Sequence, residues 1–280
     1  MGYNGRKASL IPFAPHSHTS GLSTKSSSDG AFQAYALAPR ITTCPIPSGL
    51  TLARAVVLPL SISTAATGLY QRHHLALPFP EARPSKLHRT VLIWGGASSV
   101  GSSAIQLAHA SGARVLTTAS PRNEAYCLQL GAKAVFDYHS TDVEDALVKA
   151  LSGHTLAGVF HAAGGEEAVT ACARVAARSE GKAIVVTVKP GRYEGLPGSV
   201  RVVAIASSDI FGEVGSEVAR RIWVQYLPEA LAKGSFKAAP EALVVGEGLR
   251  SVQHGLDEQK RGVHASKIVV DRIDEDSSKE

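Results

Sequence analysis

A glycine-rich segment near the middle of the chain has the composition of a phosphate-binding loop. Residues 91–94 are apolar and typical of a buried parallel strand, and the sequence after them becomes an apolar pattern at helical spacing that ends at Gly112. A loop between such elements directs main-chain N–H groups and the positive end of a helix dipole at a pyrophosphate. The candidate binding residues are Gly96, Ser98, Ser99, Val100 and Gly101.

The loop departs from the dinucleotide-binding pattern at one position. Aligned on Gly101, the pattern G-x-G-x-x-G is met at both outer glycines, whereas Ser98 replaces the middle one. Glycine-rich turns also precede helices that bind no ligand. The loop alone therefore leaves both interpretations open.

The next predicted strand, residues 113–119, ends without an acidic residue. An NAD-binding unit carries an acid about 20 residues after its loop, on the ribose hydroxyls. Here Ser120, Arg122 and Asn123 stand at that point, and an arginine pairs with a 2′-phosphate through its planar fork. NADP(H) is therefore favoured over NAD(H). In the alternative interpretation, Ser120 only caps a helix that begins at Pro121, and Arg122 is a solvated surface charge.

Beyond residue 50, predicted strands and helices alternate. This alternation predicts an α/β fold, a doubly wound parallel sheet of the Rossmann type, with its ligand at the carboxyl ends of the strands. The expected strands are 91–94, 113–119, 134–138, 158–163, 183–188, 200–206 and 266–271. The expected helices are 58–70, 120–130, a helix opened by a capping box at 141–144 and ended by Gly153, 166–178, 213–233 with a bend at Pro228, and 248–261.

Composition excludes several other classes of protein. The 280 residues are 44% hydrophobic, and the net charge of +5 comes from scattered lysines and arginines, which gives nucleic-acid binding little support. Three isolated cysteines predict neither a disulfide framework nor a zinc site, and suit a reducing, cytoplasmic setting. No apolar run approaches the roughly 20 residues of a membrane span, so no membrane partner is expected.

The eleven histidines have no metal-binding spacing, so no metal is expected. His161 is the one histidine worth testing, because it lies at the end of a predicted strand, where a parallel sheet presents ligand contacts. A serine hydrolase is excluded because the sequence has no G-x-S-x-G motif. The Tyr-x-x-x-Lys spacing of short-chain dehydrogenases occurs only at Tyr3 and Lys7.

The span from Asp29 to Ile273 resembles the medium-chain dehydrogenase/reductase superfamily. Within it, the chain is similar to the fungal zinc-independent oxidoreductases that include ToxD-like proteins and trans-acting enoyl reductases of polyketide pathways. The segments that carry the resemblance are 29–35, 58–70, 94–101, 117–123, 136–139 and 255–267, and their order is as specific as their content.

The resemblance implies roles for particular residues. Ser98 through Gly101 would hold the pyrophosphate, Ser120 and Arg122 the 2′-phosphate, and Tyr138 would close over the adenosine. The C-terminal segment of such proteins returns to the first domain and touches the cofactor, which would place Ala265 and Ser266 nearby.

Members of the superfamily begin with a GroES-like substrate domain, and only its last part is expected here. The predicted division is a flexible tail at 1–30, a remnant of the GroES-like domain at 31–55 and 240–273, an NADP-binding Rossmann domain at 56–239 and an acidic tail at 274–280. The expected protein is a monomer or a homodimer.

The implied activity is NADPH-dependent reduction of the C=C bond of an enoyl or other conjugated carbonyl substrate, free or carrier-bound. Thr64, Thr67 and Tyr70 are candidate hydrogen-bond donors for catalysis, because their spacing of three places their hydroxyls near one helical face. In the alternative, these hydroxyls only bond to the main chain of a helix packed on the sheet. The alternative function is an NADP(H)-binding protein without catalysis.

Overall fold

The computed structural model describes residues 19–21 and 38–271, and its centre is a six-stranded parallel sheet. The order of the strands across the sheet is β5-β4-β3-β6-β7-β8. Their bounds are β3 (Arg89–Trp94), β4 (Arg114–Thr118), β5 (Ala134–Phe136), β6 (Thr155–His161), β7 (Ile184–Thr187) and β8 (Arg201–Ala204). The chain builds outward from β3 in one direction and from β6 in the other, so the predicted doubly wound sheet is confirmed.

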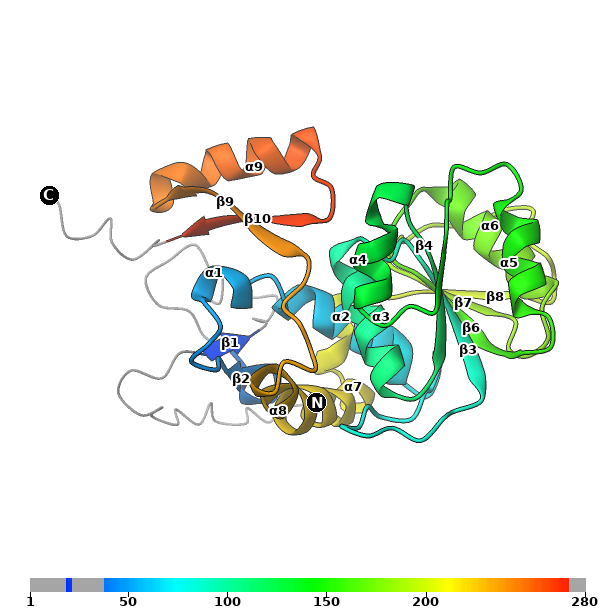
Figure 1. The fold of residues 1–280 in the computed structure, drawn as a ribbon, viewed down its shortest axis with the longest axis horizontal. Coiled ribbons are helices and arrows are strands. Elements are labelled where there is room, and N and C mark those ends of the chain that lie inside the picture. Colours follow the sequence, from blue (N-terminus) through cyan, green and yellow to red (C-terminus); the bar gives the residue numbers. More distant parts are fainter. Residues whose placement is uncertain (1–18, 22–37, 272–280) are drawn as a thin grey trace, which may run out of the picture.

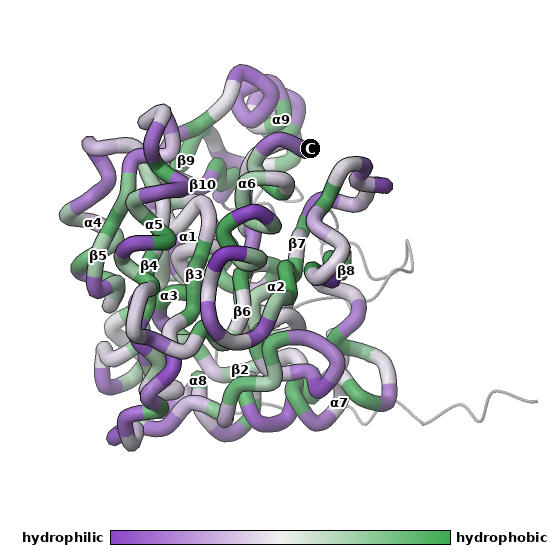
Figure 2. Tube along the Cα trace, turned by 90° about the vertical axis from the view of Figure 1, so that its right-hand side faces the viewer, coloured by the Kyte–Doolittle hydropathy of each residue, from purple (hydrophilic) through white to green (hydrophobic). Residues whose placement is uncertain are grey.

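Helices cover both faces of this sheet, which explains why its strands are nearly continuous apolar runs (Figure 1). Val91 and Ile93 of β3 pack into one buried cluster, whereas Leu92 and Trp94 pack into the other. The first cluster is covered by α2 (Pro59–Tyr70), α3 (Ser99–Ala110) and α4 (Glu124–Gln129), and the second by α5 (Val143–Leu151) and α6 (Glu166–Ala177). Figure 2 shows β3, β4 and β6 as mainly hydrophobic.

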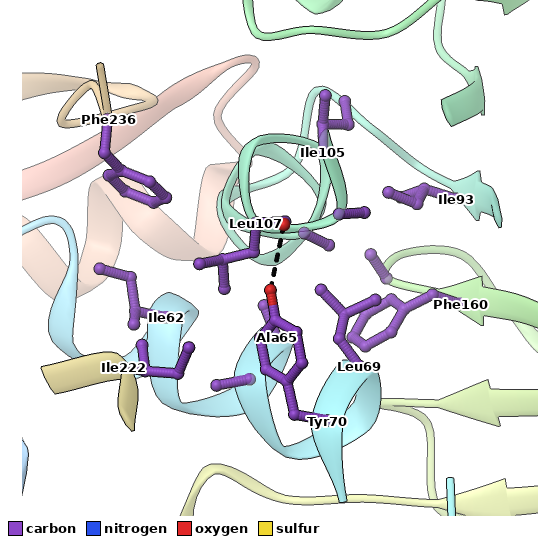
Figure 3. Close-up of a cluster of buried hydrophobic side chains, with 14 of the residues drawn as sticks. Ile62, Ala65, Leu69, Tyr70, Ile93, Ile105, Leu107, Phe160, Ile222 and Phe236 are labelled. Carbon is purple, nitrogen blue, oxygen red and sulfur yellow. Dashed lines mark hydrogen bonds between the residues drawn. The ribbon is translucent and has the colours of Figure 1, made fainter. Parts of the chain in front are cut away.

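Helix α2 is the core of the first cluster and packs along α3 (Figure 3). Gly68 is required there, because a Cβ at this position would lie 2.4 Å from the Phe160 ring. The segment Leu52–Tyr70 has the length and mean hydropathy, 1.4, of a membrane span, which corrects the expectation that no such run exists. Two thirds of it is buried inside the fold, as in a helix that fills a protein core.

A smaller unit lies beside the parallel sheet. β9 (Glu241–Glu247) and β10 (Ser266–Asp271) form a parallel pair joined through α9 (Val252–Arg261), next to α1 (Leu52–Ala55) (Figure 1). β1 (Thr19–Gly21), within the predicted tail, pairs antiparallel with β2 (Thr43–Pro45). The rest of that tail and the predicted acidic tail lie outside the described residues.

Several helix boundaries differ from the predictions for local reasons. The predicted capping box fails: α5 begins at Val143 without a side-chain cap, and Glu144 binds Arg174 instead. The predicted helix 213–233 consists of α7 (Glu213–Ala219), a π-helical turn over 220–226 and α8 (Leu227–Ala232). The π-helical turn comes just before Pro228, which has no N–H to donate to the preceding turn. The helices predicted at 120–130 and 248–261 begin with 3-10 turns, at 121–123 and 249–251.

Candidate cofactor site

A cavity of about 610 Å³ opens at the carboxyl ends of β3, β4 and β6. Its wall contains Trp94, which ends β3, and Gly95, which follows it, together with Ala119 after β4 and Ala163 after β6. β3 and β6 are neighbours in the sheet but not consecutive in the chain, so the cavity lies at the topological switch point. Open α/β sheets bind their ligands at this point.

A larger cavity, of about 1170 Å³, lies at the opposite edge, where the strands begin. Its wall includes Lys86, Arg89, Arg114 and Lys133. Arg114 donates to the Ala150 carbonyl at the end of α5, over 3.2 Å. The glycine-rich loop is not at this edge, so the smaller cavity is the candidate cofactor site despite its size.

The glycine-rich loop places the start of α3 beside the smaller cavity. The Ser98 hydroxyl accepts a hydrogen bond from the Gly101 N–H over 3.0 Å and caps the helix, which is the role of the serine that replaces the middle glycine of the pattern. In the described structure, the N–H groups of Ser99 and Val100 have no acceptor. They are therefore free to bind an anion.

The two outer glycines of the loop are needed for close packing. A Cβ at Gly101 would lie 2.2 Å from the Gly95 carbonyl oxygen, and one at Gly96 would lie 2.2 Å from the Thr117 hydroxyl. The loop is also hydrogen-bonded to β4. The Thr118 hydroxyl accepts from the Gly95 N–H, and the Thr118 carbonyl accepts from the Gly96 N–H. Gly96 and Gly101 therefore shape the loop, and neither lies in the wall of the cavity.

The residues that follow β4 line the cavity as predicted. Ser120, Arg122 and Asn123 are all in its wall. Ser120 does not cap the 3-10 turn through its side chain, because its hydroxyl accepts from the Asn123 amide over 3.1 Å. Arg122 is exposed and has no carboxylate partner within the described part of the chain. Its guanidinium is thus available to a ligand.

Two other predicted contacts reach the cavity from distant parts of the chain. Tyr138, after β5, is 42% exposed, lies in the wall and packs against His139 with ring centroids 4.1 Å apart. Ala265, just before β10, is also in the wall and adopts a left-handed conformation with φ of 46°. Ser266 begins β10 and, like Ser99 and Val100, lies outside the wall.

The three candidate catalytic hydroxyls do not reach this cavity, which corrects the expectation that they share one open helical face. The Thr64 hydroxyl donates to the Leu60 carbonyl over 2.8 Å. The Tyr70 hydroxyl lies 3.0 Å from the Leu107 carbonyl oxygen and 3.0 Å from the Ser111 hydroxyl, between α2 and α3 (Figure 3). Thr67 is fully buried, and its hydroxyl has no partner in the described structure. The sequence could not distinguish these packing positions from an open face.

His161 is fully buried at the end of β6, beneath the cavity. Its Nδ1 lies 2.9 Å from the Thr187 hydroxyl, and its Nε2 has no partner among the described residues. A Cβ at Gly164, in the cavity wall, would lie 3.4 Å from that Nε2. Burial, with a smaller contribution from the charge of Lys189, lowers the pKa of His161 to about 4. The ring is therefore neutral at pH 7.

The described residues do not fit a zinc ion. Across 19–21 and 38–271, no group of three His, Cys, Asp or Glu side chains comes close enough to hold a metal. Burial raises the pKa of the Cys44 and Cys127 thiols to about 12, so both are protonated at pH 7.

Comparison with known proteins identifies the family. Residues 99–230 match the family model described as zinc-binding dehydrogenase. The dehydrogenase azaJ of Aspergillus niger is 43% identical over 90% of this chain and 73% of its own length. The trans-enoyl reductase himH of Aspergillus japonicus is 40% identical over 91% of this chain and 72% of its own length.

Solved structures share the fold. An alcohol dehydrogenase superfamily protein from Novosphingobium aromaticivorans superposes with a TM-score of 0.70 and 22% identity, over 89% of this chain and 71% of that one. The CurK enoyl reductase superposes with a TM-score of 0.62 and 21% identity, over 82% of this chain and 65% of that chain. The chain thus spans about two thirds of that reductase. With its parallel sheet and switch-point cavity, the protein belongs to the medium-chain dehydrogenase/reductase superfamily of nicotinamide-dependent oxidoreductases, in the branch of the fungal enoyl reductases.

Proposed function

We propose that the protein is an NADPH-dependent, zinc-independent oxidoreductase that reduces the C=C bond of an enoyl or related conjugated carbonyl compound. The observation that carries the proposal is the switch-point cavity, whose wall contains the unpaired Arg122 and also Ser98, the residue directly before the free N–H groups of Ser99 and Val100. The relatives named as enoyl reductases and dehydrogenases support the reaction class.

The preference for NADPH rests on the charge of the cavity beyond β4. Arg122 offers a planar fork of N–H donors that suits a phosphate, and residues 119–123, directly after β4, include no acid. Two acids, Glu144 and Glu167, occur elsewhere in the wall. Glu144 is neutralised by Arg174, whose Nε donates to its two carboxylate oxygens over 3.1 and 2.8 Å. Arg122 therefore places a positive charge at the position proposed for the 2′-phosphate.

The residues of the chain would bind and orient the cofactor. The N–H groups of Ser99 and Val100 would hold the pyrophosphate, Arg122 with Ser120 the 2′-phosphate, and the Tyr138 ring would pack against the adenosine. The reduction would take its hydride, at the β-carbon of the conjugated carbonyl, from NADPH held by these residues, and the proton for the α-carbon from water. Ser98 and the two loop glycines position these donors, because they fix the start of α3 against the sheet.

One structural fact favours a second candidate function, an NADP(H)-binding protein without catalysis. The hydroxyls of Thr64 and Tyr70 are engaged in the core, so the described residues lack the expected donors at the cleft. Steady-state assays separate the two functions. The reductase oxidises NADPH in the presence of a panel of enones, enoyl thioesters and quinones, whereas the binding protein binds NADPH and gives only background rates.

Arg122→Glu tests the cofactor preference. Loss of a charge-assisted contact and added repulsion are expected to raise the Kd for NADPH by about 10- to 100-fold and to change the Kd for NADH little. Fluorescence titration of the purified protein measures both. Arg83→Glu makes the same charge change at an exposed position outside the cavity and should leave both constants unchanged. Equal weakening of NADPH and NADH by Arg122→Glu would show that the 2′-phosphate is not bound here.

A further inference from the structure

The cavity of about 1170 Å³ at the edge where the strands begin is lined by cations and by no acid. None of the described residues in its wall is Asp or Glu. Its basic residues are Lys86, Arg89, Arg114, Lys133 and Lys237, with His88, His109 and His154. In each of three smaller cavities of the described structure, at least one Lys or Arg shares the wall with at least one Glu. The larger one, called the basic cavity below, therefore differs from them in its excess of positive charge.

The parallel sheet brings four of these residues into one row. Arg114 and Arg89 are the first residues of β4 and β3. Lys133 and His154 directly precede β5 and β6. The strands β5, β4, β3 and β6 are consecutive in the sheet, and Arg89 pairs with Thr155, the residue after His154. Because neighbouring strands lie about 5 Å apart, basic residues that are distant in the sequence form a compact row.

Four of the five Lys and Arg side chains of the basic cavity have no partner in the described part of the chain. Arg114 is the exception, because it is half-buried and its Nη1 donates to the Ala150 carbonyl over 3.2 Å. The other four are exposed, and they form no ion pair with a described residue. Unpaired like charges around one cavity repel each other, and a bound anion would remove this repulsion.

The negative ends of three helices account for only part of this charge. The helices α3, α4 and α5 all end at this edge, where His109 of α3 and Gln129 of α4 line the cavity. Cations near the carboxyl end of a helix stabilise its dipole. Arg114 is held in this way by Ala150 of α5. The four exposed cations are not hydrogen-bonded to the helix ends, so their charges are available to a ligand.

The size and the donors of the basic cavity fit a chain of phosphates. Sites for small molecules commonly have volumes of about 300–1,000 Å³, so the cavity has room for an organic ligand. Arginine binds phosphate oxygens through parallel N–H donors, and lysine binds them as a point charge. The row holds three permanent cations, Lys133, Arg114 and Arg89, so three linked phosphates can each contact one. Leu128, 41% exposed in the same wall, offers an apolar contact to the rest of such a ligand.

We propose that the basic cavity is a second anion site, which binds a small molecule with a chain of three or more phosphates. This site is separate from the cofactor site, because the two cavities lie at opposite edges of the sheet and have no lining residue in common. The inference goes beyond the proposed function and does not depend on it.

Calorimetry with inorganic triphosphate and diphosphate tests the proposal on the full chain. Triphosphate should bind at one site per chain with a Kd at least about 10-fold below that of diphosphate, because it gains a further charge-assisted contact. The double variant Arg89→Gln/Lys133→Gln, at two exposed positions of the row, should raise the Kd for triphosphate at least about 10-fold. The variant Arg89→Lys/Lys133→Arg, which keeps both charges, should retain most of the affinity.

Two controls separate a specific site from general attraction. The double variant Arg192→Gln/Lys260→Gln removes the same net charge at exposed positions outside both cavities, and it should bind triphosphate like the wild type. The variant Arg122→Glu changes the cofactor site and should leave the Kd for triphosphate unchanged. Conversely, Arg89→Gln/Lys133→Gln should leave the Kd for NADPH unchanged, so a failure of one site is distinguished from a failure of the other.

ATP identifies the source of the phosphates. Tighter binding of ATP than of inorganic triphosphate indicates a nucleotide, equal binding indicates an inorganic chain, and both results agree with the proposal. Three results overturn it: no heat with triphosphate at millimolar concentration, equal Kd values for diphosphate and triphosphate, or an equal loss of affinity in Arg89→Gln/Lys133→Gln and Arg192→Gln/Lys260→Gln. Loss of triphosphate binding in Arg122→Glu would place the anion in the cofactor site and would overturn this inference alone.

Discussion

The contact between α2 and α3 differs from the carboxyl edge of the sheet in whether its polar groups have partners within the protein. Between the two helices, hydroxyls find partners inside the protein: Ser103 donates to Ser61 over 2.9 Å, and the Tyr70 hydroxyl contacts α3. At the carboxyl edge, the N–H groups of Ser99 and Val100 and the guanidinium of Arg122 have no partner in the described structure. A polar group that is already satisfied stabilises the fold, whereas a free group at a cavity is available for a ligand. Changes in the core should therefore alter stability, and changes at the edge should alter affinity.

The largest expected effect is on the free energy of unfolding and concerns His161, which lies between the two regions. Its pKa is about 4 in the folded protein and near 6.5 when unfolded, so the unfolded state binds more protons between these values. The stabilisation that comes from this difference in pKa is fully present above pH 6.5. The free energy of unfolding should fall by about 3 kcal/mol in total as the pH falls toward 4. Urea unfolding at several pH values measures this loss.

The control for this prediction is a pair of variants. His161→Gln should lose much of the pH dependence between pH 6.5 and 4, whereas His154→Gln, at an exposed position, should keep it. Identical slopes for the wild type and His161→Gln would mean that the buried ring does not titrate as described.

Tyr70→Phe tests whether a polar group of the core affects stability and not affinity. The substitution removes a hydroxyl that contacts the Leu107 carbonyl and the Ser111 hydroxyl, and it should lower the free energy of unfolding by about 1–2 kcal/mol. The Kd for NADPH should not change, because this hydroxyl lies outside the cavity wall. A loss of affinity or turnover at unchanged stability would return Tyr70 to the candidate catalytic residues.

Ser98→Ala should give the smallest change in the free energy of unfolding. Ser98 belongs to both regions, because it caps α3 and lies in the cavity wall. Loss of the cap on the Gly101 N–H should lower the free energy of unfolding by about 1 kcal/mol. Ser98→Gly restores the glycine of the dinucleotide pattern and should reduce stability by only a few tenths of a kcal/mol. Chemical denaturation ranks the two variants, and the reverse order would argue against the cap.

The sequence predicted the parallel sheet well because its strands are buried on both faces and therefore read as apolar runs. Ser98, Ser120, Arg122, Asn123, Tyr138 and Ala265 were all predicted as contacts, and all line one cavity. The loop and the spacing after the second strand indicated Ser98, Ser120, Arg122 and Asn123. Tyr138 and Ala265 were expected only from the resemblance to the family.

The features that were not predicted depend on contacts between distant segments. The partner of Glu144 is Arg174, 30 residues away, and no local pattern indicates that this pair displaces a capping box. The place of Ala265 in the cavity wall depends on its left-handed conformation and on the pairing of β10 with β9, a strand that the sequence did not predict. The partners of the Ser61 and Tyr70 hydroxyls lie on α3, and periodicity alone does not fix how that helix packs.

Isothermal titration calorimetry with NADPH and NADH tests the central claim most directly, namely that the carboxyl edge of the sheet binds a phosphorylated dinucleotide. The account predicts one NADPH bound per chain, with a Kd at least about 10-fold below that for NADH, because only NADPH gains the contact with Arg122. Folded protein that shows no heat of binding with either cofactor would contradict the account.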